Sequence, residues 1–256
     1  MLGAIAGDVI GSVYEGRGPV RKDFPLFDPR CEFTDDTVMT VAVAEAFRSG
    51  DNYAQHLRDW GVRYPNRGYG GMFRRWLADA NMGPYNSFGS GSAMRCSPVA
   101  WALEDLSAVL TEAKKTADAS HNHPEGVKGA QAVAAAIWLA RKGSSKEEIR
   151  KCVEDFGYTC GTSLEEFRAT LGFDETCQGT VPPAVVAFLQ SYDFEDAIRN
   201  AISLGGDTDT LACIAGSIAE PFYGGVPEEI RKKVVSLLDD DLRRVLEDFR
   251  SCYRIP

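Results

Sequence analysis

The stretch GVKGAQAVAAAIWLAR, residues 126–141, decides the fold class of this chain. It is rich in alanine, which has the highest helix propensity of all residues, and it contains no proline. Its apolar side chains surround the helix axis instead of following one stripe, a pattern typical of a helix enclosed by protein. We therefore expect a long, buried, central helix here.

Helix signals also follow this stretch along the chain. Ser145-Lys146-Glu147-Glu148 is a capping box, and the helix behind it should end near Gly157. A second capping box, Ser163-Leu164-Glu165-Glu166, predicts a helix that ends near Gly172. Such paired start and stop signals are what a chain of short, well-bounded helices requires.

Two further helices are predicted nearer the end of the chain. Asp193 can cap a helix running through Ser203, and Pro227 suits the first turn of a helix running to about Leu238. Few segments alternate apolar and polar residues over more than four positions, so strand signals are weak. We predict an all-α fold, an orthogonal helical bundle forming a single domain over residues 1–256.

The composition excludes some classes of protein. Of the 256 residues, 44% are hydrophobic and 25% charged, and the net charge of -9 lacks the basic footprint of general nucleic-acid or anionic-membrane surfaces. The apolar start of the chain has no basic leader and is too short for a membrane span. The seven cysteines form no Cys-x-x-Cys pair, so we expect no structural zinc site and a reducing, cytoplasmic location. We expect a monomer.

Three glycines at a spacing of four, Gly3, Gly7 and Gly11, lie in an otherwise apolar segment. This spacing places them on one face of a helix. Each costs about 1 kcal/mol of helix stability relative to alanine, so something must approach this face closely. Close packing of another helix is the simplest explanation.

The first acidic cluster is Thr34-Asp35-Asp36. An apolar helical run, residues 38–47, follows it, so Asp35 or Asp36 should lie at a helix N-terminus. A helix cap with extra acids stabilised by the helix dipole explains such a cluster when it stands alone.

The second acidic cluster, Asp207-Thr208-Asp209-Thr210, changes this interpretation. It follows two glycines and again precedes an apolar helical run, residues 211–219. Two buried helix N-termini with paired aspartates need a counter-charge, and a cation is the simplest one. Carboxylate and hydroxyl oxygens suit Mg²⁺, Ca²⁺ or Mn²⁺, and the number of carboxylates fits two ions better than one.

Four other features could carry chemistry, each with a structural alternative. Asp8 interrupts an apolar helix and is either a solvated acid or a buried one, and Glu15 stands where that helix should end. The run Gly89-Ser90-Gly91-Ser92-Ala93-Met94-Arg95 could cradle a phosphate at a helix start or form a plain turn. His121 precedes the alanine-rich helix and is a ligand contact or a loop residue.

In their order along the chain, these motifs resemble those of the ADP-ribosylglycohydrolase family. The resemblance spans residues 3 to about 225. The matching pieces are Gly7-Asp8-x-x-Gly11-Ser12-x-x-Glu15, Thr34-Asp35-Asp36-Thr37, Gly89-Ser90-Gly91-Ser92-Ala93-Met94-Arg95, Ser120-His121 and Gly206-Asp207-Thr208-Asp209-Thr210.

The resemblance implies an all-α fold with two Mg²⁺ ions, or Mn²⁺ in their place. The implied metal ligands are Thr34, Asp35, Asp36, Asp207, Asp209 and Thr210. The implied catalytic carboxylates are Asp35, Asp36 and Glu15. The residues implied to hold the substrate, with its diphosphate and distal ribose, are Gly89, Ser90, Gly91, Ser92, Met94 and His121. Glu15 matches a glutamate that lies near the metals and can move.

The implied activity is hydrolysis of the glycosidic bond at C1 of the distal ribose, which releases ADP-ribose from an acceptor. The acceptor stays open between arginine, serine, a nucleobase, a small molecule and an O-acyl group. Two other functions would use the same residues. One is a non-catalytic regulator that binds ADP-ribose or a nucleotide, and the other is a different dinuclear-metal phosphohydrolase.

Overall fold

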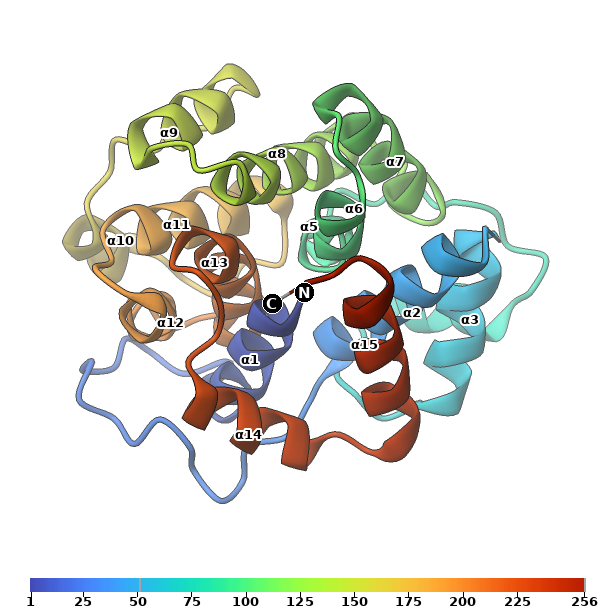
Figure 1. Ribbon diagram of the computed structural model, residues 1–256, viewed down its shortest axis with the longest axis horizontal. Coiled ribbons are helices and arrows are strands. Elements are labelled where there is room, and N and C mark those ends of the chain that lie inside the picture. The colour runs from blue at the N-terminus through green and yellow to red at the C-terminus, as the bar shows by residue number, and fades with distance from the viewer. Residues whose placement is uncertain (51, 256) are drawn as a thin grey trace.

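The computed structural model describes residues 1–50 and 52–255, which form helices joined by loops (Figure 1). In these residues no β-strand occurs, and only the isolated bridges Arg17–Gly206 and Gly89–Thr176 pair antiparallel. The all-α prediction is confirmed. The helices are α1 (Leu2–Gly11), the 3-10 helix η1 (Ser12–Tyr14), α2 (Asp35–Ser49), α3 (Tyr53–Arg63), α4 (Gly71–Ala78), α5 (Gly91–Met94), α6 (Ser97–Ala102), α7 (Leu106–Asp118), α8 (Pro124–Arg141), α9 (Lys146–Asp155), α10 (Leu164–Thr170), α11 (Cys177–Leu189), α12 (Phe194–Ser203), α13 (Thr208–Phe222), α14 (Glu228–Leu237) and α15 (Asp240–Cys252).

The glycine face of α1 lies directly against α13. A Cβ atom at Gly3 would stand 2.2 Å from the carbonyl oxygen of Gly216, and one at Gly7 would stand 2.0 Å from that of Ala212. A Cβ atom at Gly11 would stand 2.5 Å from the carbonyl oxygen of Thr208. Such distances leave no room for any side chain, so the predicted close helix packing is confirmed and fixes the start of α13 beside the end of α1.

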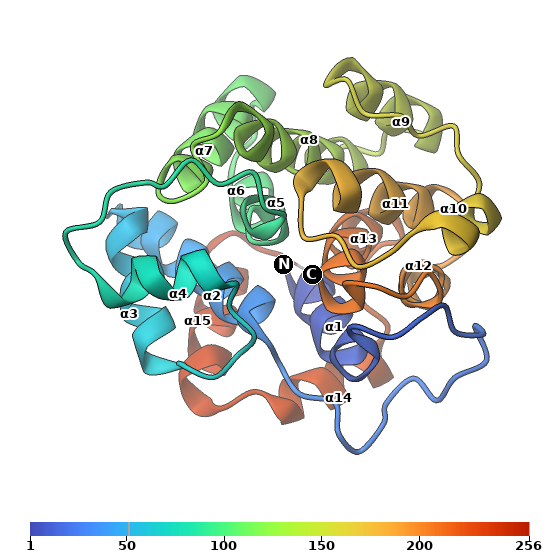
Figure 2. The ribbon, with the colours of Figure 1, turned by 180° about the vertical axis from the view of Figure 1, so that it is seen from behind.

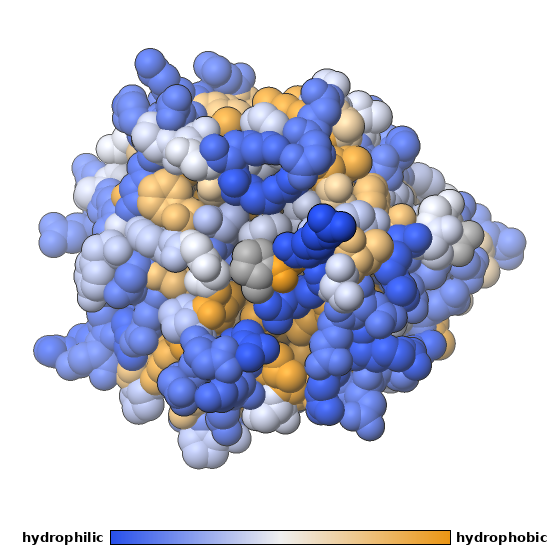
Figure 3. Space-filling view, in the orientation of Figure 1, coloured by the Kyte–Doolittle hydropathy of each residue, from blue (hydrophilic) through white to orange (hydrophobic). Residues whose placement is uncertain are grey.

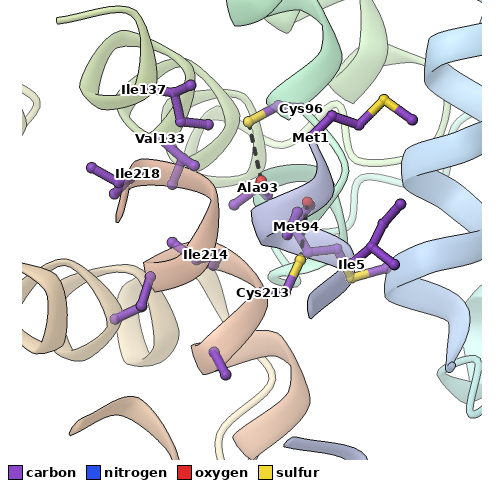
Figure 4. Close-up of a cluster of buried hydrophobic side chains, with 14 of the residues drawn as sticks. Met1, Ile5, Ala93, Met94, Cys96, Val133, Ile137, Cys213, Ile214 and Ile218 are labelled. Atoms are coloured by element: carbon purple, nitrogen blue, oxygen red, sulfur yellow. Dashed lines mark hydrogen bonds between the residues drawn. The ribbon is translucent and has the colours of Figure 1, made fainter. Parts of the chain in front are cut away.

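The alanine-rich stretch forms α8, as predicted. The helix begins earlier than residue 126 because His123 caps it, accepting a hydrogen bond from the backbone N–H of Glu125, and Pro124 occupies the first turn. Helices α7, α9 and α13 all pack on α8. Figure 4 shows Val133 and Ile137 of α8 beside Ile218 of α13. Helix α13, whose first thirteen residues are all buried, takes the more central place.

The predicted caps are confirmed with small shifts. Both capping boxes, at Ser145 and Ser163, form with reciprocal hydrogen bonds, and Asp193 caps α12 through the backbone N–H of Asp196. Pro227 stands one residue before α14 and not in its first turn. These local signals therefore locate helix starts to within a residue.

The surface is mostly hydrophilic on the face shown in Figure 3. Among the residues described, no helix is long and apolar enough to cross a membrane. A long segment between η1 and α2 runs out from the body of the molecule and returns to it, as seen at the lower right of Figure 2. This segment connects η1, which is followed by Glu15, to α2, whose first residues are Asp35 and Asp36.

Candidate active site

The two acidic clusters meet where α2 and α13 begin. Thr34 caps α2, since its side chain accepts a hydrogen bond from the N–H of Asp36, and Asp207 stands at the N-cap of α13. The Thr210 hydroxyl donates to Oδ2 of Asp36 at 3.2 Å. Two sequence clusters more than 170 residues apart are thereby joined into one site.

Asp8 of α1 holds the start of α2 in place. Its buried carboxylate accepts hydrogen bonds from the backbone N–H groups of Thr34 and Thr37, each at 3.0 Å, and from both hydroxyls, that of Thr34 at 2.6 Å. The alternative of a solvated Asp8 is therefore wrong. Its buried hydrogen bonds are charge-assisted, and they fix the first turn of α2 against α1.

The carboxylates form two groups that share Asp209. In one, oxygens of Asp8, Asp36 and Asp209 lie within 4.8 Å of one another, and in the other the same holds for Glu15, Asp207 and Asp209. Within residues 1–50 and 52–255, Oδ1 of Asp36 and Oδ1 of Asp209 are buried without a hydrogen-bond partner. Buried anionic oxygens without partners are costly, so the donor set fits hard divalent cations.

The raised pKa values of these acids also indicate a site that requires a cation. Burial raises the pKa of Asp36 and of Asp209 well above the ordinary aspartate value, and neighbouring carboxylates raise both further. Burial also raises the pKa of Asp207 to about 6. The pKa of the exposed Glu15 is raised by its partial burial and by the charge of Asp207. A bound cation would reverse this preference for the neutral form.

Backbone geometry brings Glu15 to the second group. Gly205 and Gly206 both have a φ of +76°, a conformation that glycine adopts without strain. The N–H of Gly16 donates to the Gly206 carbonyl at 2.8 Å, and the N–H of Gly206 donates to the Arg17 carbonyl at 2.9 Å. The residue after η1 therefore lies beside the first acid of α13.

The acids line one part of the wall of a pocket of about 610 Å³, a size typical of small-molecule sites. Most of the predicted site residues line it: Glu15, Asp35, Asp36, Gly89, Ser90, Gly91, Met94, His121, Asp207, Asp209 and Thr210. Thr34 and Ser92 do not line it. The Thr34 hydroxyl donates to Asp8, and the Ser92 hydroxyl donates to the Gly126 carbonyl at 2.7 Å, which ties α5 to α8.

The Gly-Ser loop and His121 form another wall of the pocket. A Cβ atom at Gly91 would stand 3.0 Å from Nε2 of His121, so the glycine lets the backbone lie against the imidazole. On its other side, Nδ1 of His121 lies 2.7 Å from the Ser120 hydroxyl, which accepts from Arg95 at 2.9 Å. Burial, and then the charge of Arg95, lower the pKa of His121 well below its usual value, so the ring is neutral.

Several lining residues were not predicted from the sequence. Gly68, Gly70, Met72 and Phe73 come from the region between residues 50 and 88, which carried no recognised motif. Glu175 also lines the pocket, and its backbone carbonyl accepts a hydrogen bond from the N–H of Ser90 at 2.7 Å. Gly70 and Gly71, at the start of α4, were the available signal, because paired glycines permit close approach of a ligand.

Comparisons with known proteins agree with the sequence resemblance. Residues 1–254 match the sequence profile of the ADP-ribosylglycohydrolase family. ADP-ribosylhydrolase ARH3 of Gallus gallus is 26% identical over 88% of this chain and 84% of its own length. ADP-ribosylarginine hydrolase Tri1 of Pseudomonas putida (strain GB-1) is 29% identical over 91% of this chain and 72% of its own length. A solved ADP-ribosylglycohydrolase-related protein complex shares the fold, with a TM-score of 0.74, 24% identity and coverage of 99% of this chain and 95% of that one.

Proposed function

Because the chain belongs to the ADP-ribosylglycohydrolase family, whose members are enzymes that hydrolyse ADP-ribose linkages, we propose that its pocket holds the ADP-ribosyl group with the distal ribose at the acidic end. The observation that carries this proposal is a pair of buried oxygens, on Asp36 and Asp209, that have no hydrogen-bond partner in the described part of the chain and belong to residues lining a pocket of about 610 Å³. Membership of the family makes a purely regulatory protein the weaker alternative.

The family and the acid cluster support a metal-dependent site, and we assign it two Mg²⁺ ions, with Mn²⁺ as a substitute. The proposed ligands are Thr34, Asp35, Asp36, Asp207, Asp209 and Thr210. Asp209 belongs to both carboxylate groups, so its carboxylate would help to hold both ions. Divalent cations here would supply positive charge that binds sugar hydroxyls and stabilises developing negative charge.

The wall of the pocket that the Gly-Ser loop forms suits the diphosphate. Backbone N–H groups of the loop from Gly89 to Met94, which opens α5, are donors for phosphate oxygens. His121 is neutral, so its imidazole serves as a hydrogen-bonding group and not as a counter-charge. Holding the diphosphate away from the scissile bond fixes the orientation of the reacting ribose.

We assign the proton transfer to Glu15. Its carboxylate is exposed and has no hydrogen bond within residues 1–50 and 52–255, so it is free to take a proton from the attacking water. Asp36 is 2% exposed and accepts from Thr210, which suits a fixed charge better than a proton carrier. Asp35 and Asp36 would stabilise the oxocarbenium-like charge at C1.

A product assay tests this proposal. The protein is incubated with ADP-ribosylserine and ADP-ribosylarginine peptides, with Mg²⁺ or with a chelator, and the products are identified by mass spectrometry. We expect intact ADP-ribose and the unmodified peptide, formed only with the metal. Release of AMP or phosphate would identify a phosphohydrolase instead, and full turnover under chelation would contradict the metal assignment.

A further inference from the structure

A second hollow, of about 310 Å³, reaches the acidic cluster from another side. It shares Glu15 and Gly68 with the ligand pocket, so these two residues form the partition between the two spaces. Thr34 lines this second hollow and not the first. A glycosidic bond placed at the cluster would therefore have room on both sides, with the ADP-ribosyl group on one and the acceptor on the other.

The walls of the second hollow carry more positive than negative charge. Arg17, Arg30 and Arg67 line it, against Glu15 and Glu32. The Arg67 guanidinium donates to Glu32 at 2.7 Å and stacks on the Phe33 ring, with a distance of 3.9 Å to the centroid.

Among the residues that the structure describes, the remaining two arginines differ, since one forms an ion pair and the other does not. Arg30 forms a two-pronged pair with Asp28, at 2.8 and 2.9 Å. Within the described part of the chain, the exposed Arg17 makes no ion pair, and its guanidinium lies 5.9 Å from the centre of the Tyr14 ring. The pKa of Asp28 is lowered by its hydrogen bonds from Arg30 and also by the charge of Arg17, but Asp28 is itself paired with Arg30, so no direct ion pair keeps Arg17 from a ligand.

The backbone that presents Arg17 is held firmly. Gly206 pairs with Gly16 and Arg17 through two backbone hydrogen bonds. Further along the same segment, Arg199 of α12 donates to the carbonyls of Lys22 and Phe24, both at 2.7 Å. The backbone at Arg17 is therefore fixed beside the hollow, and its exposed side chain starts from a defined position.

On the basis of the proposed function, we propose that this hollow is the acceptor subsite and that it prefers an ADP-ribosylated peptide with acidic residues beside the modified one. A carboxylate on such a peptide would meet Arg17, whereas a basic peptide would be repelled by it. Since the charges are exposed, the expected preference is about threefold to fivefold in kcat/KM at low salt, and it should shrink as salt screens it.

The test uses one ADP-ribosylserine peptide with glutamate, glutamine or lysine flanks, and free ADP-ribosylserine as the flank-free substrate. Wild type should hydrolyse the glutamate-flanked peptide fastest, and Arg17→Glu should reverse the order in favour of lysine flanks. The matched control is Arg21→Gln. Arg21 lies on the same segment outside the hollow, is paired with Asp23 and is 88% exposed, so its loss should change nothing.

A second measurement does not depend on turnover. Binding of the unmodified glutamate-flanked peptide, labelled with a fluorophore, is followed by anisotropy with wild type and Arg17→Glu in the presence of Mg²⁺ and ADP-ribose, and weaker binding by the variant is expected. Equal kcat/KM for all three flanks, equal binding by the two proteins, or an equal fall on every substrate in Arg17→Glu would each overturn the acceptor assignment. Failure of wild type to hydrolyse the flank-free substrate would instead contradict the proposed function, and the anisotropy result would still decide the acceptor assignment.

Discussion

Helix α13 takes part in two regions of the molecule, a close helix contact along its middle and a group of carboxylates at its N-terminus. Along its middle it packs on α1 through backbone and small residues, and no side chain fits between Gly7 and Ala212. At its N-terminus it carries Asp207 and Asp209 into a group of carboxylates, with one buried oxygen of Asp209 left unpartnered. The helix contact is fully packed without any ligand, whereas the buried carboxylates require a bound cation to balance their charge. Mutations in the first should damage the fold, and mutations in the second should damage function while sparing the fold.

The largest effect is expected at the helix contact. In Gly7→Ala the new Cβ would stand 2.0 Å from a backbone carbonyl oxygen, so α1 and α13 must move apart. We expect a loss of more than about 3 kcal/mol in the free energy of unfolding, measured by chemical denaturation. Gly83→Ala is the control, because nothing lies within 4 Å of its Cβ position. Equal stability of Gly7→Ala and wild type would show that the contact is looser than described.

The next largest effect is expected at the acid shared by the two carboxylate groups. Asp209→Asn removes a charge from both groups while keeping the side-chain shape, so hydrolysis should fall by more than about a hundredfold. Without metal, the variant should be at least as stable as wild type, because asparagine is neutral in this buried site without having to bind a proton. A variant that unfolds at the temperature of the assay would place Asp209 with the structural region instead.

The stability of the metal-free protein should depend on pH in a defined direction. Asp207 has an ordinary pKa of 3.8 and a folded-state pKa of about 6, so the folded state binds more protons between these values. Its contribution to stability is complete below about pH 4 and is lost as the pH rises through 6.

Added Mg²⁺ should offset this loss, since it replaces the protons. Melting temperatures measured with Mg²⁺ and with chelator should therefore differ more at pH 7.5 than at pH 5. A Mg²⁺ effect that is the same at both values would contradict the coupling between protons and metal.

The smallest effect on the free energy of unfolding is expected when each of two buried tyrosines is replaced by phenylalanine. The Tyr69 hydroxyl, which feels the charge of Asp35, has no hydrogen-bond partner among the described residues, whereas that of Tyr53 donates to Glu112 at 2.6 Å. Tyr53→Phe should lower the free energy of unfolding by about 1 kcal/mol, and Tyr69→Phe should leave it unchanged or raise it slightly. A loss in Tyr69→Phe as large as in Tyr53→Phe would reveal a partner for that hydroxyl and sharpen the boundary between the two regions.

Much of the helical framework follows from local sequence. The capping boxes at Ser145 and Ser163 and the alanine-rich α8 depend on residues a few positions apart, so they can be predicted from one sequence. The glycine spacing in α1 likewise predicts a close contact, though not that α13 is the partner.

The rest of the site depends on residues that are far apart in the sequence and that the fold brings into contact. Asp8 organises the first turn of α2, yet its partners stand 26 and 29 residues away. Ser92 matches a substrate-loop motif, but its hydroxyl is directed to the Gly126 carbonyl because α5 lies on α8. Phe73 lines the pocket from α4, whose placement no local pattern predicts.

Direct counting of bound Mn²⁺ tests the central claim, that the acids at the starts of α2 and α13 form a divalent-metal centre. Electron paramagnetic resonance of free Mn²⁺ during titration gives the number of ions bound per chain for wild type and Asp209→Asn. We predict two ions for wild type and the loss of at least one in the variant, with Glu165→Gln, an exposed acid on α10, unchanged. Wild type that binds no Mn²⁺, or Asp209→Asn that binds as many ions as wild type with the same affinity, would contradict the account.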